Sequence, residues 1–244
     1  MNNFIDFNAL TDGQMTQYRE AITHAFPAII GESPVIKNCW SKLESYFPSS
    51  QLFLMSDQGE VIGFMNTVPF RFEESLDHLP DRGWDWMLMK SIQDFELETT
   101  PNYLGGLQVI VRQKFQGQGY SKVILSHAKN YVADSHMNNL IIPIRPTKKH
   151  EFPSMTMSSY LTYKPKDKLY DPWIRTHIAS GAHVIKVCEQ SMIMKGNVHF
   201  WESILNQKIE RSGQYQLDGA LSLIKIDVEN DTGEYIEPNI WIKY

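Results

Sequence analysis

Residues 109–125 read Val-Ile-Val-Arg-Gln-Lys-Phe-Gln-Gly-Gln-Gly-Tyr-Ser-Lys-Val-Ile-Leu. An apolar run from Tyr103 to Val111 ends just before the glycines, and apolar residues recur at helical spacing from Gly119 to Ser135. This stretch therefore predicts a strand that passes through a glycine turn into an amphipathic helix. The apolar run from Leu140 to Ile144 predicts a buried parallel strand, which completes a β-turn-α-β unit.

The glycine turn has the properties of a diphosphate-binding site. The first N–H groups of a helix lack partners, and the positive end of the helix dipole attracts anions. Gly117 and Gly119 allow unusual dihedral angles and a close approach of the backbone, while Ser121 is small and adds a hydroxyl donor. Lys114 and Lys122 would add positive potential. We therefore expect a phosphate-bearing ligand on the backbone of this turn.

The same segment resembles motif A of the GCN5-related N-acetyltransferases. That pattern is Gln or Arg, two residues, Gly, one residue, then Gly or Ala; here it becomes Gln116, Gly119 and Ser121, with Ser departing from the last slot. The resemblance implies acetyl-CoA as co-substrate, with Val109 and Val111 contacting the pantetheine arm through their main chains. The cofactor-binding residues that we expect are Val109, Ile110, Val111, Gln116, Gly117, Gln118, Gly119, Tyr120, Ser121 and Lys122.

A second resemblance concerns the helix predicted from Asp171 to Ser180 and ended by Gly181. Many family members carry Tyr four residues before that glycine, and here the position is His177. The resemblance implies an acid that protonates the departing CoA thiolate, so we expect His177 in this role. Tyr163 is the second candidate and Tyr160 is a further one, while the alternative for His177 is a structural or solvated histidine.

The general base is left open by the sequence. The family's mechanism implies direct attack of an amine on the thioester, aided by a base and by a backbone donor that polarises the carbonyl. Gln108 interrupts the apolar strand and could only orient a water. Glu98, His150, Glu151 and Asp171 are the other candidates, each with an alternative as solvated surface. The acceptor is expected to be a small-molecule or peptide amine.

The remaining patterns predict one α/β (α+β) domain over residues 1–244, with a mixed, largely antiparallel sheet flanked by helices. We expect a core of about 50–195, an insertion over 145–170 and a C-terminal extension of about 196–244. The extension would cover the sheet, shape the acceptor pocket or form a homodimer contact. Strand-like runs at 184–187 and 191–194 are expected to pair as a hairpin. Helices are predicted at 15–25, 33–46, 83–95 and 197–206, and a hairpin at 51–68.

Composition excludes several classes of protein. The formal net charge of -5 argues against a nucleic-acid binder, which would carry clustered Lys and Arg. Cys39 and Cys188 are too few for a disulfide framework and too far apart for a metal knuckle, so we expect no metal. The start Met-Asn-Asn-Phe-Ile-Asp lacks the pattern of a secretory signal, and no run approaches 18 apolar residues. We expect a cytoplasmic protein without a membrane partner.

Three functions remain open at this point. The preferred one is an acetyl-CoA-dependent N-acetyltransferase, an acyltransferase of the resembled family. The alternative is a non-catalytic acyl-CoA-binding or regulatory protein that keeps the phosphate loop but lacks an acid and a base. A nucleotide-binding oxidoreductase is disfavoured because the Gly-x-Gly-x-x-Gly spacing is absent. The basic run 145–150 is either a contact to a substrate carboxylate or CoA phosphate, or a solvated loop.

Overall fold

The computed structural model describes residues 3–244. Residues 1–2, the start of the segment in which we expect no secretory signal, lie outside the described part. The helices are α1 Asp12–Thr23, α2 Ala28–Gly31, α3 Pro34–Tyr46, α4 Gly83–Glu96, α5 Tyr120–Asp134, α6 Met157–Thr162, α7 Pro172–Ala179 and α8 Val198–Leu205. The strands are β1 Asn3–Ile5, β2 Leu52–Met55, β3 Val61–Phe70, β4 Tyr103–Val111, β5 Leu140–Ile144, β6 His183–Gly196, β7 Gly213–Tyr215, β8 Ile224–Asp227 and β9 Thr232–Lys243.

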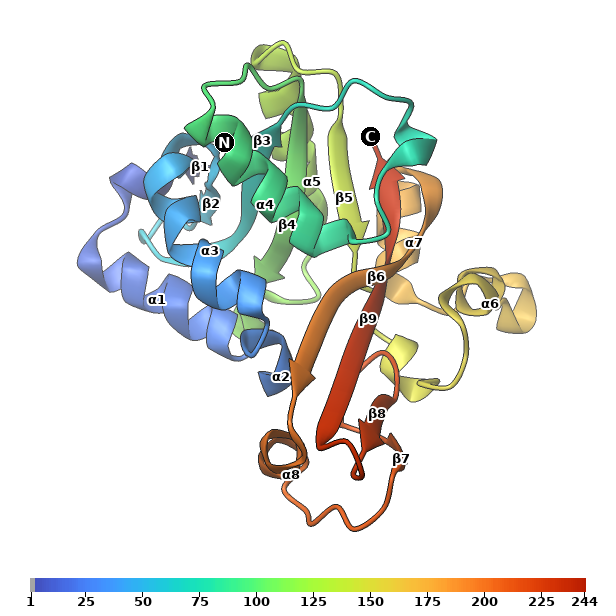
Figure 1. Cartoon of the computed structure of the whole chain (residues 1–244). Helices are drawn as coiled ribbons and strands as arrows, with labels where there is room; N and C mark the ends of the chain where they lie inside the picture. Colours follow the sequence, from blue (N-terminus) through green and yellow to red (C-terminus); the bar gives the residue numbers. More distant parts are fainter. Residues whose placement is uncertain (1–2) are drawn as a thin grey trace.

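One sheet joins all of these strands. Its order is β1-β2-β3-β4-β5-β9-β8-β7, and β6 pairs with β9 beside this path. Only the β4–β5 pair is parallel, because α5 returns the chain between them, as the sequence predicts. The fold class is therefore confirmed: the sheet is mixed, largely antiparallel and flanked by helices (Figure 1).

Two hydrophobic cores lie on the two faces of this sheet. On one face α3 and α4 pack against the strands, and on the other face α5 and α7 do so (Figure 1). Side chains alternate along β5, so that Ile141 enters the α4 core while Leu140, Ile142 and Ile144 enter the α5 core. A strand buried on both faces explains the unbroken apolar run in its sequence.

Local signals fix the ends of the helices. Thr11 accepts a hydrogen bond from the N–H of Gln14, and the Gln14 side chain accepts one from the N–H of Thr11, so a capping box starts α1. Ser33 caps α3 ahead of a proline at its first position. The Asp171 carboxylate accepts from the first N–H groups of α7. These caps stabilise the starts of α1, α3 and α7.

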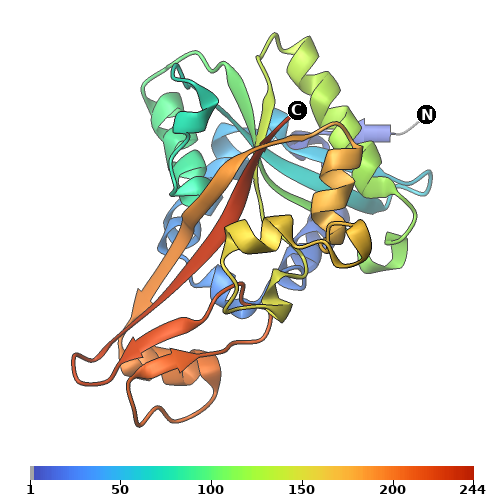
Figure 2. The ribbon, with the colours of Figure 1, turned by 90° about the vertical axis from the view of Figure 1, so that its right-hand side faces the viewer.

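The division into core and extension needs a correction. Strand β9, which lies in the supposed extension, pairs with β5 through Ile144↔Ile240 and with β6 through Val187↔Ile240. Residues 232–243 are therefore part of the central sheet. Between β6 and β9 the chain forms α8, β7 and β8 at the far end of the long β6–β9 pair (Figure 2).

The hairpin expected from residues 184–187 and 191–194 is also wrong. Both runs belong to one long strand, β6, whose partner is β9, and the register shifts between Cys188 and Met192. The intervening Glu189 and Gln190 are not turn formers, so nothing in this stretch favours a tight reversal. Instead the strand bulges there, and the Ser191 hydroxyl accepts a hydrogen bond of 2.8 Å from the N–H of Trp84.

Candidate functional site

Strands β4 and β5 part from each other soon after they meet. Their pairing is confined to Leu104↔Leu140 and Gly105↔Ile141. Beyond Gly105, the edge of β4 that faces β5 has no strand partner within residues 3–244. An unpaired edge of this kind offers N–H and C=O groups to an extended ligand, as an added strand would use them.

A β-bulge bends β4 at the point where the strands separate. Asn66 of β3 pairs with Gln108, but the next residue, Thr67, pairs with Gly106, so that Leu107 is the additional residue. The carbonyl of Leu107 accepts a hydrogen bond of 2.9 Å from Trp84 Nε1. The bulge is therefore held in place by α4, and β4 stays paired with β3 on both sides of it.

The glycine turn follows the open end of β4. Gly117 and Gly119 have φ values of +77° and +83°, and a Cβ at either would meet no atom within 4 Å. These dihedral angles favour glycine, because other residues rarely adopt them. In the described part of the chain, the N–H groups of Gly117 and Gly119 donate no hydrogen bond. Tyr120 and Ser121 start α5, where the N–H groups have no intrahelical acceptor.

One cleft of about 800 Å³ contains both features. Eight of the ten residues expected to bind the cofactor line it: Val109, Ile110, Val111, Gln116, Gly117, Gly119, Tyr120 and Ser121. Gln118 and Lys122 are exposed beside it and do not line it. Lys114 forms an ion pair with Glu60, so its charge is partly neutralised. The geometry brings the predicted residues together, while their binding role stays a prediction.

His177 lies against the same cleft from α7 and is 1% exposed. Its Nδ1 is 2.6 Å from the Tyr244 hydroxyl, and its Nε2 has no partner among residues 3–244. Burial lowers the pKa of His177 to about 3 and raises the pKa of Tyr244. Because the phenol keeps its proton, we infer that it donates to Nδ1 and that the ring hydrogen is on Nε2. His177 is then a neutral hydrogen-bond donor.

The other end of the cleft is polar. The Glu237 carboxylate accepts hydrogen bonds from Arg145 Nε at 2.8 Å, from Arg145 Nη2 at 3.2 Å and from the Tyr235 hydroxyl at 2.7 Å. Asn239 is 2% exposed, and its Nδ2 has no partner in the part of the chain that the structure describes. Glu237, Asn239 and Arg145 all line the cleft. A buried ion pair and an unpaired amide therefore lie across from the glycine turn's strand.

Aromatic side chains wall this end of the cleft. Trp40 and Trp84 stack with ring centroids 6.3 Å apart and an interplanar angle of 8°. Both line the cleft together with Phe26, which precedes α2. Their position gives a flat apolar wall to this end of the cleft, which we call the chamber and which is lined by Arg145, Glu237, Asn239, Trp40 and Trp84.

Comparisons with known proteins agree with this geometry. An arginine N-acetyltransferase of Aspergillus versicolor, avaD, is 27% identical over 245 aligned residues, which cover 89% of this chain and 84% of the relative. No protein-family model matches the chain.

Two solved structures superpose over nearly the whole chain. The GphF GNAT-like decarboxylase in complex with isobutyryl-CoA has a TM-score of 0.59 at 9% identity and covers 99% of this chain and 98% of its own. The loading GNATL domain of CurA from Lyngbya majuscula has a TM-score of 0.52 at 16% identity and covers 100% and 97%. The chain therefore has the fold of the GCN5-related N-acetyltransferases (GNAT).

The tyrosines proposed as alternative acids of this GNAT-fold protein lie elsewhere. Tyr163 ends α6 and packs against Phe152 and Tyr170, with centroids 5.5 Å apart in each pair, and it does not line the cleft. The Tyr160 hydroxyl donates to the Asp171 carboxylate at 2.8 Å. Of the three side chains that the sequence suggested, only His177 is brought to the cleft.

The acidic residues suggested as bases are not in the GNAT cleft either. Asp171 is occupied by the N-cap of α7, by the N–H of Lys148 and by Tyr160. Glu151 is paired with Lys148 and Tyr170 at the surface. Glu98 and His150 do not line the cleft. Gln108 does line it, and its Nε2 donates to Asn66 Oδ1 at 2.7 Å, which leaves its amide oxygen without a donor among residues 3–244.

Sequence reasoning missed Glu237 and Asn239 because they lie in the segment assigned to an extension. A signal was present: Tyr235, Glu237 and Asn239 recur at every second position of a strand, which places three polar residues on one face. Polar residues on the buried face of a central strand require partners or a ligand.

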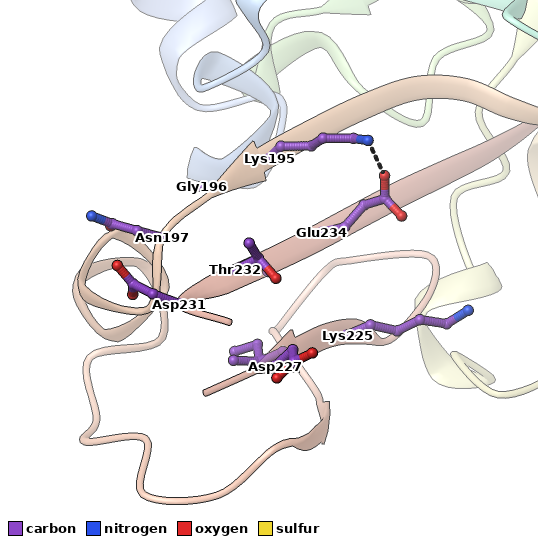
Figure 3. A pocket seen from close by; sticks show the side chains of 10 residues that line it. Lys195, Gly196, Asn197, Lys225, Asp227, Asp231, Thr232 and Glu234 are labelled. Carbon is purple, nitrogen blue, oxygen red and sulfur yellow. Dashed lines mark ion pairs between the residues drawn. The ribbon is translucent and has the colours of Figure 1, made fainter. Parts of the chain in front are cut away.

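A second hollow, of about 670 Å³, lies at the far end of the molecule, where β6, β8 and β9 meet α8. Lys195 and Glu234 form an ion pair of 2.9 Å across it (Figure 3). It shares no lining residue with the cleft and contains no residue that the sequence singled out.

Within residues 3–244, no group of three or more His, Cys, Asp or Glu side chains is placed to hold a metal ion. No helix in that range could span a membrane.

Proposed function

We propose that this chain is an acetyl-CoA-dependent N-acetyltransferase that moves an acetyl group to a primary amine. The observation that carries the proposal is the single cleft that joins a helix start with free N–H groups, an unpaired strand edge and a separate polar chamber. The relative named an arginine N-acetyltransferase supports an amine acceptor, and the solved relative with isobutyryl-CoA supports a CoA-based donor.

The donor would lie along the first two features. The free N–H groups from Gly117 to Ser121 hold the diphosphate, and the dipole of the fifteen-residue helix α5 adds favourable potential. The edge of β4 holds the pantetheine amides through the main chains of Val109 and Val111. Gln118 and Lys122, exposed at the rim, contact the outer part of the coenzyme.

The reaction requires the amine nitrogen to bond to the acetyl carbon while the carbon–sulfur bond breaks. The leaving CoA thiolate takes up one proton, and the amine loses one. His177 offers an N–H at Nε2 that hydrogen-bonds the developing thiolate. Because the pKa of His177 is lowered to about 3 by burial, the ring acts as a neutral donor and not as an imidazolium acid. Tyr163 serves as a proton donor only if the segment after α6 moves into the cleft.

The amine proton leaves most simply through water. Glu237 is the only carboxylate that lines the cleft within residues 3–244, but Arg145 and Tyr235 already occupy its oxygens. The free amide oxygen of Gln108 lies in the cleft and can orient a water or the incoming amine.

Turnover with a panel of amines tests this proposal. The protein is incubated with acetyl-CoA and amino acids, polyamines, amino sugars or peptides, and the released CoA thiol is measured. We expect thiol release with at least one amine, and the product amine to carry one acetyl group. Binding of acetyl-CoA without release across the panel would contradict the proposal and favour the non-catalytic alternative.

A thermal-shift comparison separates the coenzymes. A ligand at about a hundred times its dissociation constant stabilises by roughly 2.7 kcal/mol. We expect acetyl-CoA to raise the melting temperature and NAD to leave it unchanged. Stabilisation by NAD alone would support an oxidoreductase instead.

A further inference from the structure

The guanidinium of Arg145 is only partly used by the protein. Arg145 has five N–H donors in a planar fork. Nε donates to Glu237 Oε1 at 2.8 Å, and Nη2 donates to Glu237 Oε2 at 3.2 Å and to the Gly219 carbonyl at 2.7 Å. Within residues 3–244 the two donors on Nη1 make no hydrogen bond. The side chain is 19% exposed and lines the cleft, so these donors are open to a ligand.

The fork is held rigidly. Glu237 is 0% exposed and is itself fixed by the Tyr235 hydroxyl, whose oxygen accepts from the N–H of Leu221. The carbonyl that binds Nη2 belongs to Gly219, where a Cβ would lie 2.6 Å from Pro27 Cγ. The loop before α2 therefore packs directly against Gly219, whose carbonyl binds Arg145. A guanidinium fixed in this way loses little freedom when it binds an anion.

A second unpaired donor lies in the same chamber. Asn239 Nδ2 is buried without a partner in the described part of the chain, two residues along β9 from Glu237 and on the same strand face. A buried donor left without a partner costs free energy, so its presence points to an acceptor supplied by a ligand. The unsatisfied groups of Arg145 and Asn239 are thus all donors.

We infer that this chamber binds the carboxylate of a free amino acid, which makes an α-amino acid the acceptor. The inference rests on the proposed function. The two free donors on Arg145 Nη1 and the amide of Asn239 can each donate to a carboxylate oxygen, and hydrogen bonds between a guanidinium and a carboxylate are stronger than those between neutral groups. Arg145 is the only Lys or Arg that lines the cleft among residues 3–244, fewer cations than a phosphate group would be expected to meet. The coenzyme diphosphate has its own donors at the glycine turn.

The rest of the chamber suits the remainder of an amino acid. The stacked Trp40 and Trp84 offer an apolar wall for the side chain of the acceptor, while the carboxylate binds Arg145 and Asn239. The carboxylate is then anchored beside β9, and the amine is directed toward the split between β4 and β5. Anchoring at a fixed point orients the nucleophile, which lowers the entropic part of the barrier.

Calorimetric binding to the protein saturated with CoA tests the inference without requiring turnover. Each series of ligands keeps one side chain and changes only the carboxylate: L-arginine, L-argininamide and agmatine, or L-phenylalanine, its amide and phenethylamine. In the series that binds most tightly, we expect the amino acid to bind about a hundredfold more tightly than its amide or decarboxylated amine. Equal binding of the three members of each series, or no binding by any amino acid, would overturn the inference.

Two variants test which residues produce the preference for ligands with a carboxylate. Arg145→Met combined with Glu237→Gln removes both charges together, so that no buried charge is left unpaired and the fold is retained. Asn239→Leu removes the second donor alone and leaves the ion pair intact. We expect the double variant to lose the preference for carboxylates and Asn239→Leu to reduce it about tenfold, with the affinity for acetyl-CoA within twofold of the parent.

A fall in the affinity of the double variant for acetyl-CoA, with acceptor discrimination unchanged, would show that Arg145 serves the coenzyme and would contradict the inference. Thiol release measured on the same ligands separates the two proposals. Acetylation that ignores the carboxylate refutes the inference alone. Carboxylate-dependent binding without acetyl transfer supports the inference and refutes the proposed function.

Discussion

The environment of His177 determines which chemistry its ring can perform. By the resemblance described above, the residue occupies the position at which many GNAT members carry tyrosine, and it lines the cleft. The hydrogen bond from Tyr244 fixes the ring through Nδ1, and the edge of Trp173 packs on it with centroids 4.2 Å apart. A buried ring with these neighbours has no charged partner to stabilise an imidazolium. Its contribution is therefore orientation and hydrogen bonding.

The buried histidine has a measurable consequence for stability. The pKa of His177 is about 3 in the folded protein against 6.5 for a solvent-exposed histidine, so between these values the unfolded chain binds more protons and acid favours unfolding. This loss is absent above pH 7 and grows as the pH falls. From pH 8 to pH 5 the parent should lose about 2 kcal/mol more than His177→Asn, as measured by urea unfolding. Parallel losses in the two proteins would contradict the assignment of a neutral ring.

At the scale of elements, the sequence predicted those strands and helices whose formation depends on residues close together in the chain. The strand 103–111, the strand 140–144 and the helix between them follow from apolar spacing and from the glycine turn, and the structure places them within one residue of those limits. The bulge at Leu107 could not be predicted, because it depends on a hydrogen bond to Trp84, which is distant in the chain. Contacts of this kind leave no local pattern.

The long β6–β9 pair shows more clearly that contacts between distant residues cannot be predicted from local sequence. Its partners are separated by α8, β7 and β8, so no local periodicity reveals which strand adds to β5. The sequence of residues 232–243 does not identify the strands with which they pair. The chamber depends on this pairing between distant strands. For that reason Glu237 and Asn239 could not be predicted as site residues, whereas the glycine turn could.

Hydrogen exchange tests the roles of the elements. If the coenzyme binds along β4 and the start of α5, acetyl-CoA at about a hundred times its dissociation constant should slow exchange by up to about a hundredfold at residues 107–111 and 117–121. Amides at 192–196 and 233–236, in the far half of the β6–β9 pair, should be unchanged. Protection at the far half without protection at the glycine turn would place the coenzyme elsewhere.

At the scale of the whole molecule, the segment between β6 and β9 holds Arg145 in place and so helps to enclose the chamber. The Gly219 carbonyl holds Arg145, the Leu221 carbonyl accepts from Lys149 Nζ at 2.8 Å, and Pro27 packs on Gly219. The β4–β5 unit, where we propose that the coenzyme binds, lies on one side of the cleft, whereas this segment and the loop before α2 shape the chamber on the other. The acceptor chamber therefore combines residues from the beginning and the end of the described chain.

A pair of glycine substitutions tests this closure. Gly219 and Gly59 have φ values of +78° and +77°, so a side chain strains the backbone equally, but only at Gly219 does a Cβ approach Pro27, at 2.6 Å. Gly219→Val should lose about 1–3 kcal/mol more stability than Gly59→Val in chemical unfolding, and its acceptor KM should rise. Equal losses and an unchanged KM would show that the contact does not shape the chamber.

The most direct test of the coenzyme site is the affinity of Gly119→Trp for acetyl-CoA, measured by calorimetry beside Gly59→Trp. Both glycines have positive φ, at +83° and +77°; a Cβ at Gly119 would meet no atom within 4 Å and one at Gly59 only Gln14 Nε2, at 3.9 Å, but only Gly119 lines the cleft. The account predicts that Gly119→Trp binds acetyl-CoA at least about a hundredfold more weakly, because the indole fills the space of the diphosphate, and that Gly59→Trp binds like the parent. Parent-like binding by Gly119→Trp would contradict it.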